Sequence, residues 1–454
     1  MLNNCKLKLA VTSVLLALLL NAKVSFAVVL EEALKSAILS NEKFKILQES
    51  FLQSSEQVPR AISDAFMPKT AISSSIIKND KTSLGTTSNQ QQLSNSIQTT
   101  LPVFSGGAGL ASLKTSHNIV MAAKYQYYKD EQNTIINLIN LYIDYHVANE
   151  IYKIRKASTL NAKQNYEAAK EKVILGEATK TDLAFAESSF SKAKTEELKS
   201  LTEKENKYQE FAVNFNMSPE ETILPRVDSK QFEDLDFFTN KVQKQNLDLK
   251  IYSYNLQSAS SNVSATLASS FSPTVSLTAS SGTKARVGSM RFNNFGNQDP
   301  TIQLNINIPL LSRGGQEFAD VRTSRSKERA VALTLASLQK SVQTSITSSL
   351  SNYKTFKLSI ESAKAAVDAR ELYLKGVEQE YGLGNKSLLD LLQADSDLAN
   401  DKITYVQTVS AYIKSFYALK SLVGELTAKK MRLGIKVFDP EVVYTRKKIG
   451  FITF

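Results

Sequence analysis

One stretch of 16 residues occurs twice in this chain, 208 residues apart, and it limits the folds that the chain can adopt. The first copy is 173–188, VILGEATKTDLAFAES, and the second is 381–396, YGLGNKSLLDLLQADS. The identical positions are Leu175, Gly176, Asp182, Leu183, Ala186 and Ser188, which recur as Leu383, Gly384, Asp390, Leu391, Ala394 and Ser396. Glycine is unfavourable inside a helix but common at a left-handed end cap, and Thr179 and Ser387 are suited to cap a returning helix. Each copy is therefore predicted to be the tip of a helical hairpin.

Both tips are carried by long helical arms. From 108 to 172 and from 316 to 380 the sequence has no proline and almost no glycine, and its apolar residues keep a three-four spacing. A helix of about 65 residues is about 98 Å long at a rise of 1.5 Å per residue. Because this exceeds the length of ordinary globular helices, the pattern predicts antiparallel coiled-coil hairpins. The predicted hairpins are about 107–216 and 315–424.

Before each hairpin the apolar period changes to two, which is typical of strands. The predicted strands are about 69–79, 92–103, 273–282 and 300–310. The polar run 80–92 and the Gly- and Asn-rich run 282–299 are predicted to be loops. In the last strand, polar residues separate four aliphatic ones: Ile302, Leu304, Ile306 and Ile308. Such strands fit either a half-buried soluble sheet or a transmembrane β-barrel, and the lack of a second apolar layer favours the barrel.

Both strand pairs end in the same proline and glycine motif before the helical hairpin begins. The corner residues Pro102, Gly106 and Gly107 correspond to Pro309, Gly314 and Gly315. Proline has no N–H group for a strand ladder, and the glycine pair leaves the backbone free to turn into a helix.

The ends and connections of the chain divide it further. Residues 29–58 are predicted to form a helix that ends near Pro59, and 247–268 a second short helix. The domain boundaries that follow are a signal peptide at 1–27, a first repeat at 28–217, a linker at 218–238, a second repeat at 239–430 and a C-terminal tail at 431–454.

Composition excludes several classes of function. The only cysteine, Cys5, lies in the predicted signal peptide, so the mature chain has no thiol chemistry. His117 and His146 are isolated, which argues against a metal site, and no phosphate-binding loop occurs, so we expect neither an enzyme nor a cofactor. The net charge of +11 falls to +8 when three lysines leave with the signal peptide, and it is spread along helices rather than gathered for nucleic acid.

A helix, two strands and a long hairpin, made twice behind a signal peptide, resemble the TolC-type outer-membrane efflux proteins. The resemblance covers essentially the whole mature chain, and the corners and the tips are its most specific motifs. It implies an α+β fold in which a homotrimer shares a 12-stranded transmembrane β-barrel that continues as a periplasmic α-helical barrel.

The resemblance also implies roles for residues at the tips. The implied periplasmic gate consists of Thr181, Asp182, Tyr381 and Lys386. Many relatives have arginine where this chain has Lys386, which cannot form a bidentate fork with a carboxylate. The implied acidic pore ring is Asp390, extended by Asp397, and the tips at Gly176 and Gly384 are the implied docking sites for a periplasmic adaptor.

The implied function is that of a passive exit duct in the outer membrane of a Gram-negative bacterium, in contact with outer-membrane lipid. Such ducts serve tripartite efflux or type I secretion, in which an adaptor and an inner-membrane pump or ABC exporter supply the energy. The alternative is a coiled-coil surface fibre or adhesin, which would not need strand pairs within each repeat. The sequence leaves open whether the cargo is drugs, amphiphiles or secreted polypeptides.

Overall fold

The computed structural model of the chain describes residues 28–83, 86–219, 221–227, 232, 235–287 and 296–449. The predicted signal peptide, 1–27, lies outside the described residues, as do 450–454 of the tail. In chain order the elements are β1 (Val28–Val29), α2 (Leu30–Ser40), α3 (Glu42–Ser55), α4 (Gln57–Phe66), β2 (Lys69–Ser83), β3 (Thr86–Phe104), α5 (Ala108–Ile174), α6 (Lys180–Phe215), β4 (Thr222–Ile223), α7 (Leu235–Gln245), α8 (Leu247–Phe271), β5 (Thr274–Val287), β6 (Gly296–Asn307), α9 (Gln316–Gly382), α10 (Leu388–Leu422) and α11 (Pro440–Ile449).

The chain folds into two compact units. The hairpin unit takes its described residues from 28–45, 131–240 and 345–436, and the strand unit takes them from 46–130, 241–344 and 437–449. The strand unit has its own aromatic core, in which Phe51 and Tyr127 pack edge to face with ring centroids 6.3 Å apart. Phe438, which precedes α11, lies against both rings.

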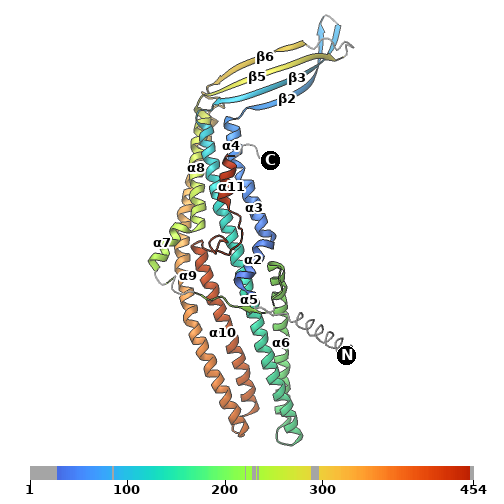
Figure 1. Cartoon of the computed structure of the whole chain (residues 1–454), viewed down its shortest axis with the longest axis vertical. Coiled ribbons are helices and arrows are strands. Elements are labelled where there is room, and N and C mark those ends of the chain that lie inside the picture. The colour runs from blue at the N-terminus through green and yellow to red at the C-terminus, as the bar shows by residue number, and fades with distance from the viewer. Residues whose placement is uncertain are drawn as a thin grey trace, which may run out of the picture. The chain divides into compact units, whose positions relative to one another are not determined.

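Two long helical hairpins dominate the hairpin unit (Figure 1). The arms α5 and α9 are each 67 residues long, and they begin 208 residues apart at Ala108 and Gln316. The first part of each arm belongs to the strand unit and the rest to the hairpin unit. The returning helices α6 and α10 also begin 208 residues apart, at Lys180 and Leu388. The sequence repeat is thus a repeat of whole helical hairpins with the same length of arm.

The strand unit contains one four-stranded antiparallel sheet in the order β2-β3-β5-β6 (Figure 1). The β2–β3 hairpin and the β5–β6 hairpin form one sheet because β3 pairs with β5. Strands β2 and β6 lie at its edges. Aliphatic side chains on one face of the sheet are exposed, and the most exposed are Ile72 at 81 % and Ile302 at 74 %. The other face is polar, with cross-strand hydrogen bonds such as Ser73 Oγ to Ser96 Oγ at 2.7 Å.

The described residues of the polar run 80–92 belong to the sheet rather than to a loop. β2 extends to Ser83 and β3 starts at Thr86, so residues 80–83 pair with 86–89. Ser, Thr, Asn and Gln are typical of loops, but they can complete a ladder when both strands carry them, since backbone groups make its hydrogen bonds. The strands of the first hairpin are therefore longer than the predicted 69–79 and 92–103.

The corners also differ in detail from the expectation. Pro102 lies inside β3 opposite Ser276, and the register shifts between Pro102 and Phe104, so this proline marks an irregularity rather than the strand end. β5 runs on to Val287, beyond the predicted 282, and β6 ends at Asn307, before Pro309. Proline is tolerated at a bulge because the ladder is already interrupted there.

The N-terminal helix is divided into three pieces and runs past its predicted end. Asn41 separates α2 from α3, and α4 continues through Pro59 to Phe66. Pro59 is the third residue of α4. The N–H groups of the first turn of a helix have no partner within the helix, so a proline, which has no N–H, is tolerated there.

The predicted linker at 218–238 contains regular structure. β4 pairs in parallel with β1, placing Val28 opposite Thr222, and α7 begins at Leu235. The Tyr142 hydroxyl lies against both short strands, 2.6 Å from Val28 O and 2.8 Å from Ile223 O. Burial raises the pKa of Tyr142 to about 12. In the described ranges, no helix is both long enough and apolar enough to cross a membrane.

Candidate functional site

The hairpin tips are built by the same local structure in both repeats. Gly176 and Gly384 have φ of +77° and +78°, the left-handed region that glycine adopts without strain. The next residue donates back into the arm, from Glu177 N to Lys172 O at 2.8 Å and from Asn385 N to Glu380 O at 2.8 Å. A left-handed glycine followed by a hydrogen bond from residue i to the carbonyl of residue i−5 is the Schellman motif, and it ends each arm.

Reciprocal caps start the returning helices. The Thr179 hydroxyl accepts from Asp182 N at 3.1 Å, and the Asp182 carboxylate accepts from Thr179 N at 3.1 Å. Ser387 and Asp390 repeat the arrangement in the second tip. Hydrogen bonds from the capping residue lower the pKa of both carboxyl groups, so both stay ionised at pH values below the ordinary pKa of an aspartate.

An apolar cluster near the tips joins the two hairpins of one chain. Its buried members come from all four long helices, namely Ala169, Ala186, Val377, Leu388, Leu391, Leu392 and Ala394. Tyr381 packs against this cluster from α9. The tips of one chain are therefore packed together rather than free.

Lys172 binds Tyr381 across the two hairpins, a contact that the sequence analysis missed. The Lys172 ammonium lies 4.6 Å from the centre of the Tyr381 ring, and its Nζ lies 3.4 Å from the tyrosine hydroxyl. The only local signal is the position of Lys172, one turn before Gly176, because its partner is more than two hundred residues away in sequence.

Replacing Lys172 with methionine should loosen the tips while keeping an apolar stem against the cluster. A half-exposed cation–π contact contributes about 0.5–1 kcal/mol, so amide hydrogen exchange around Gly384 should become about two- to five-fold faster. Lys170→Met, at an exposed position of the same turn, is the matched control. Equal exchange in both variants would show that Lys172 does not hold the tips.

The two acidic residues predicted for the pore, Asp390 and Asp397, have different hydrogen-bond and charge partners. Asp390 serves the cap of α10, whereas Asp397 lies 3.5 Å from Arg370 and accepts from Gln393 at 2.8 Å. Arg370 also binds Asp401 at 3.1 Å, which ties α9 to α10 within the second hairpin. Sequence reasoning did not identify Arg370, since its two partners are on the other arm.

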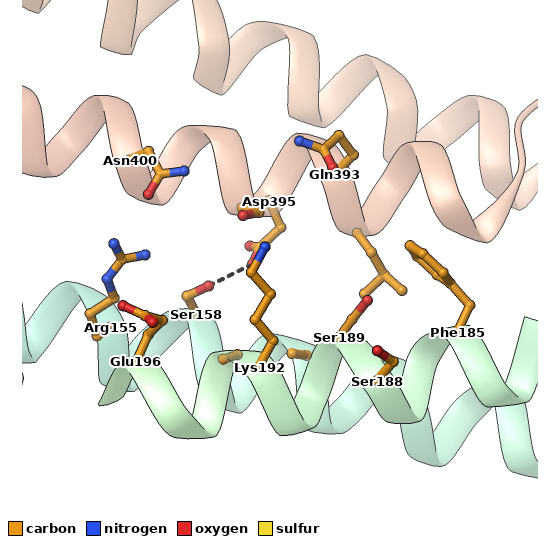
Figure 2. A pocket seen from close by; sticks show the side chains of 14 residues that line it. Arg155, Ser158, Phe185, Ser188, Ser189, Lys192, Glu196, Gln393, Asp395 and Asn400 are labelled. Carbon is orange, nitrogen blue, oxygen red and sulfur yellow. Dashed lines mark hydrogen bonds between the residues drawn. The ribbon is translucent and has the colours of Figure 1, made fainter. Parts of the chain in front are cut away.

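A groove lies between the first hairpin and α10. It encloses about 430 Å³, and Arg155 and Lys192 line it together with Glu196 and Phe185 (Figure 2). Asp395 of α10 also lines the groove, and it accepts a hydrogen bond from Ser158 Oγ of α5 at 3.1 Å.

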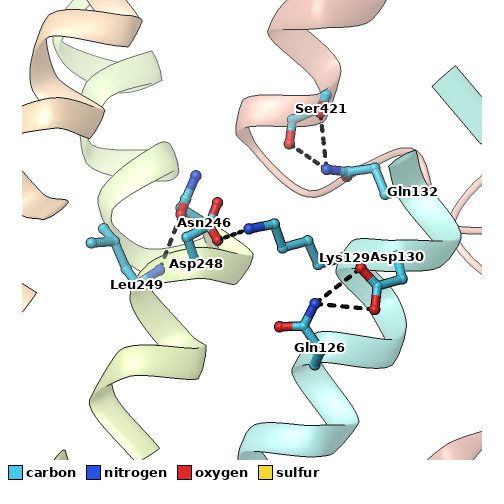
Figure 3. Close-up of polar contacts among 8 residues, drawn as sticks. All are labelled: Gln126, Lys129, Asp130, Gln132, Asn246, Asp248, Leu249 and Ser421. Atoms are coloured by element: carbon cyan, nitrogen blue, oxygen red, sulfur yellow. Dashed lines mark hydrogen bonds and ion pairs between the residues drawn. The ribbon is translucent and has the colours of Figure 1, made fainter. Parts of the chain in front are cut away.

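Further polar contacts occur inside each unit (Figure 3). In the hairpin unit, Gln132 Nε2 donates to Ser421 O and Oγ, both at 2.9 Å. In the strand unit, Lys129 forms an ion pair with Asp248, near the start of α8. In the part of the chain that the structure describes, no group of His, Cys, Asp and Glu residues could hold a metal ion.

The corner before α9 is held by a residue that the sequence analysis did not select. The Glu317 carboxylate accepts from Arg313 N at 2.6 Å and from Gly315 N at 3.0 Å. Its pKa is lowered chiefly by a hydrogen bond from its own backbone N–H, and further by these two. Gly314 and Gly315 have φ of +64° and +94°, like Gly106 and Gly107 at the first corner. A Cβ atom at Gly106 would lie 2.1 Å from Ser272 Cβ, so only glycine fits there.

Comparison with known proteins relates the chain to one family. Residues 239–425 match the family model described as outer membrane efflux protein. The efflux protein BepC of Brucella suis is 24 % identical over 363 residues, which are 78 % of this chain and 76 % of that protein. The chain therefore carries a match to the outer membrane efflux protein family at 239–425, and it resembles such proteins over most of its length.

Solved structures with this fold include outer-membrane channels. The Campylobacter jejuni CmeC channel superposes with a TM-score of 0.77 at 16 % identity, covering 92 % of this chain and 89 % of that one. VceC from Vibrio cholerae gives 0.73 at 15 % identity, covering 87 % and 96 %. This chain therefore shares its fold of duplicated long hairpins and strand pairs with these channels.

Within one chain, the predicted gate residues are only partly brought together. Asp182 accepts from Thr179, and Tyr381 contacts Lys172, whereas Thr181 is exposed beside the cap. No hydrogen bond or ion pair among the described residues joins Asp182 to Tyr381 or Lys386. A gate made of these residues consequently stays a prediction about the assembled oligomer.

Proposed function

We propose that this efflux-family protein is one subunit of a trimeric outer-membrane exit duct that passively conducts cargo delivered by an inner-membrane pump through a periplasmic adaptor. The observation that carries the proposal is the exposed aliphatic face of the sheet, on strands joined to the long hairpins. Leu304 and Ile306 on this face are 59 % and 62 % exposed, and the neighbouring positions Gln303 and Asn305 point to the polar face.

The open sheet edges support closure by further copies. β2 and β6 are edge strands with unpaired backbone groups, and such edges are not tolerated in hydrocarbon. Three copies of a four-stranded sheet would provide a 12-stranded barrel, with aliphatic side chains towards lipid and polar side chains towards the channel. Twelve long helices would then continue the duct into the periplasm.

The tips are proposed as the closed end and as the docking site of the adaptor. Thr181, Asp182, Tyr381 and Lys386 form the proposed gate. Three copies of Asp390 around one axis would form a negative ring that favours cations. Arg370 offsets the charge of Asp397, so we propose that Asp397 contributes less to the ring than Asp390 does.

The proposal is tested by isolating affinity-tagged protein from the bacterium's own envelope after mild cross-linking. We expect an adaptor and an inner-membrane pump to co-purify, and susceptibility to exported compounds to rise when the protein is deleted. A surface fibre would co-purify with neither and leave susceptibility unchanged. The named relatives are efflux channels and do not support the fibre alternative.

A further inference from the structure

Two lysines of the strand unit lie against one pair of stacked tyrosines. Lys124 and Tyr125 belong to α5, and Lys250 and Tyr254 belong to α8, all within the ranges of the strand unit. The rings of Tyr125 and Tyr254 stack with their centroids 5.6 Å apart and their planes 16° apart. The Nζ atoms of Lys124 and Lys250 lie 5.1 Å and 5.2 Å from the centre of the Tyr125 ring. Two ammonium groups, one from each helix, are therefore held beside the same ring.

Lys124 is a buried cation without a carboxylate partner. The residue is only 8 % exposed, although lysine is almost always found at the surface unless it is paired. Among the described residues, its ammonium group forms no ion pair and no hydrogen bond, and it faces the ring of Tyr125. Contact with an aromatic ring compensates only part of the cost of removing an ammonium group from water.

Lys250 is in a position where three effects disfavour its charge. Burial lowers its pKa, and the positive charge of Lys124 lowers it further. Lys250 is also the fourth residue of α8, and the partial positive charge at the start of a helix repels a cation in the first turn. An anion bound beside the two lysines would offset all three effects.

The nearby carboxylates do not neutralise these two lysines. Asp248, in the same turn as Lys250, forms an ion pair with Lys129 (Figure 3). Glu441 of α11 is exposed to solvent and lies near Tyr125, whose pKa is raised chiefly by burial and further by the Glu441 charge. In the described part of the chain, neither carboxylate forms an ion pair with Lys124 or Lys250. The two ammonium groups are thus available to a group from outside the chain.

We propose that Lys124 and Lys250, beside the stacked Tyr125 and Tyr254, bind a phosphate dianion between α5 and α8. Two ammonium groups match two negative charges, and lysine binds phosphate as a point charge. The first turn of α8 adds the positive end of a helix to the same site. The dianion is either free phosphate or the phosphate of a lipid headgroup, for which the tyrosine rings provide an apolar surface. The site lies within one chain and does not depend on conduction through the proposed duct.

Thermal unfolding of the full-length protein in detergent tests this site, with inorganic phosphate added at constant ionic strength and about pH 8, where phosphate is a dianion. A ligand that binds only the folded protein raises the unfolding midpoint as its concentration exceeds the dissociation constant. We expect the midpoint of the wild type to rise with phosphate. Lys250→Met keeps the apolar stem and should weaken phosphate binding about ten-fold or more, since one of two charges is lost.

The behaviour of this variant without phosphate is a second, independent readout. Lys250→Met should raise the unfolding midpoint in phosphate-free buffer, because the repulsion between the two buried ammonium groups is removed. Lys124→Met should do the same, and it serves for the comparison if Lys250→Met does not fold. Lys244→Met removes an exposed lysine of α7 in the same unit and should keep the phosphate response of the wild type.

Dihexanoyl phosphatidic acid in the same assay distinguishes the two sources of phosphate. Stabilisation at about ten-fold lower concentration than inorganic phosphate assigns the site to a lipid headgroup, and equal or weaker stabilisation assigns it to free phosphate. Equal phosphate responses of the wild type, Lys250→Met and Lys244→Met would show a general salt effect and overturn the site. A lower midpoint of both lysine variants in phosphate-free buffer would also overturn it, because their charges would then already be compensated within the protein.

Discussion

Arginine in place of Leu304 should prevent the protein from accumulating in the outer membrane as an assembled oligomer. Leu304 lies opposite Leu277 on the aliphatic face of the sheet and is exposed in a single chain. If this face contacts lipid, an arginine near the bilayer midplane costs about 2–4 kcal/mol in each copy, and every copy of the ring carries it. Fractionation of the membranes, followed by electrophoresis of unheated samples, would measure the loss of the oligomer.

Gln303→Arg is the matched control for this experiment. Gln303 precedes Leu304, pairs with Thr278 and points to the polar face, where an arginine can remain in water. We expect nearly normal amounts of oligomer in this variant. If both variants insert equally well, the aliphatic face does not contact lipid, and the proposed orientation of the barrel is wrong.

Removing the charges of the proposed gate should open the periplasmic end. We expect Asp182→Asn with Lys386→Gln to raise single-channel conductance several-fold and to admit large antibiotics into cells. Partly exposed polar links contribute about 1 kcal/mol or less each, so the gate can be opened without unfolding the protein. Asparagine keeps the side-chain oxygen that accepts from Thr179, so the cap of α6 should survive.

A control for charge removal is available farther along α6. Glu196 and Lys199 form an exposed ion pair at 2.8 Å, one turn apart on the same helix and away from the tip. Glu196→Gln with Lys199→Gln should leave the conductance at the wild-type value. If the gate variant is folded and oligomeric but conducts like this control, Asp182 and Lys386 are not part of the gate.

The hairpin tips could be predicted from sequence because their structure is local. Gly176 needs a left-handed backbone, Thr179 caps the helix three residues later, and both signals lie within one turn. The lengths of the arms followed from the absence of proline. Duplication strengthened both predictions, since two copies carried the same signals at the same spacing.

Features that depend on distant partners could not be predicted in the same way. The run 80–83 is polar, and it becomes a strand only because 86–89 pairs with it. The partner of Lys172 is on another hairpin, and Arg370 meets Asp397 across two helical arms. Polarity and period describe a segment by itself, whereas these contacts depend on which segments the fold brings together.

Copies of this chain should enclose a conducting duct, and conductance across a planar bilayer tests this most directly. Full-length oligomer extracted from the outer membrane should insert in discrete steps, with low conductance for the wild type and higher conductance for Asp182→Asn with Lys386→Gln. Folded oligomer of the mass of three chains that inserts without carrying current in either form would contradict the account.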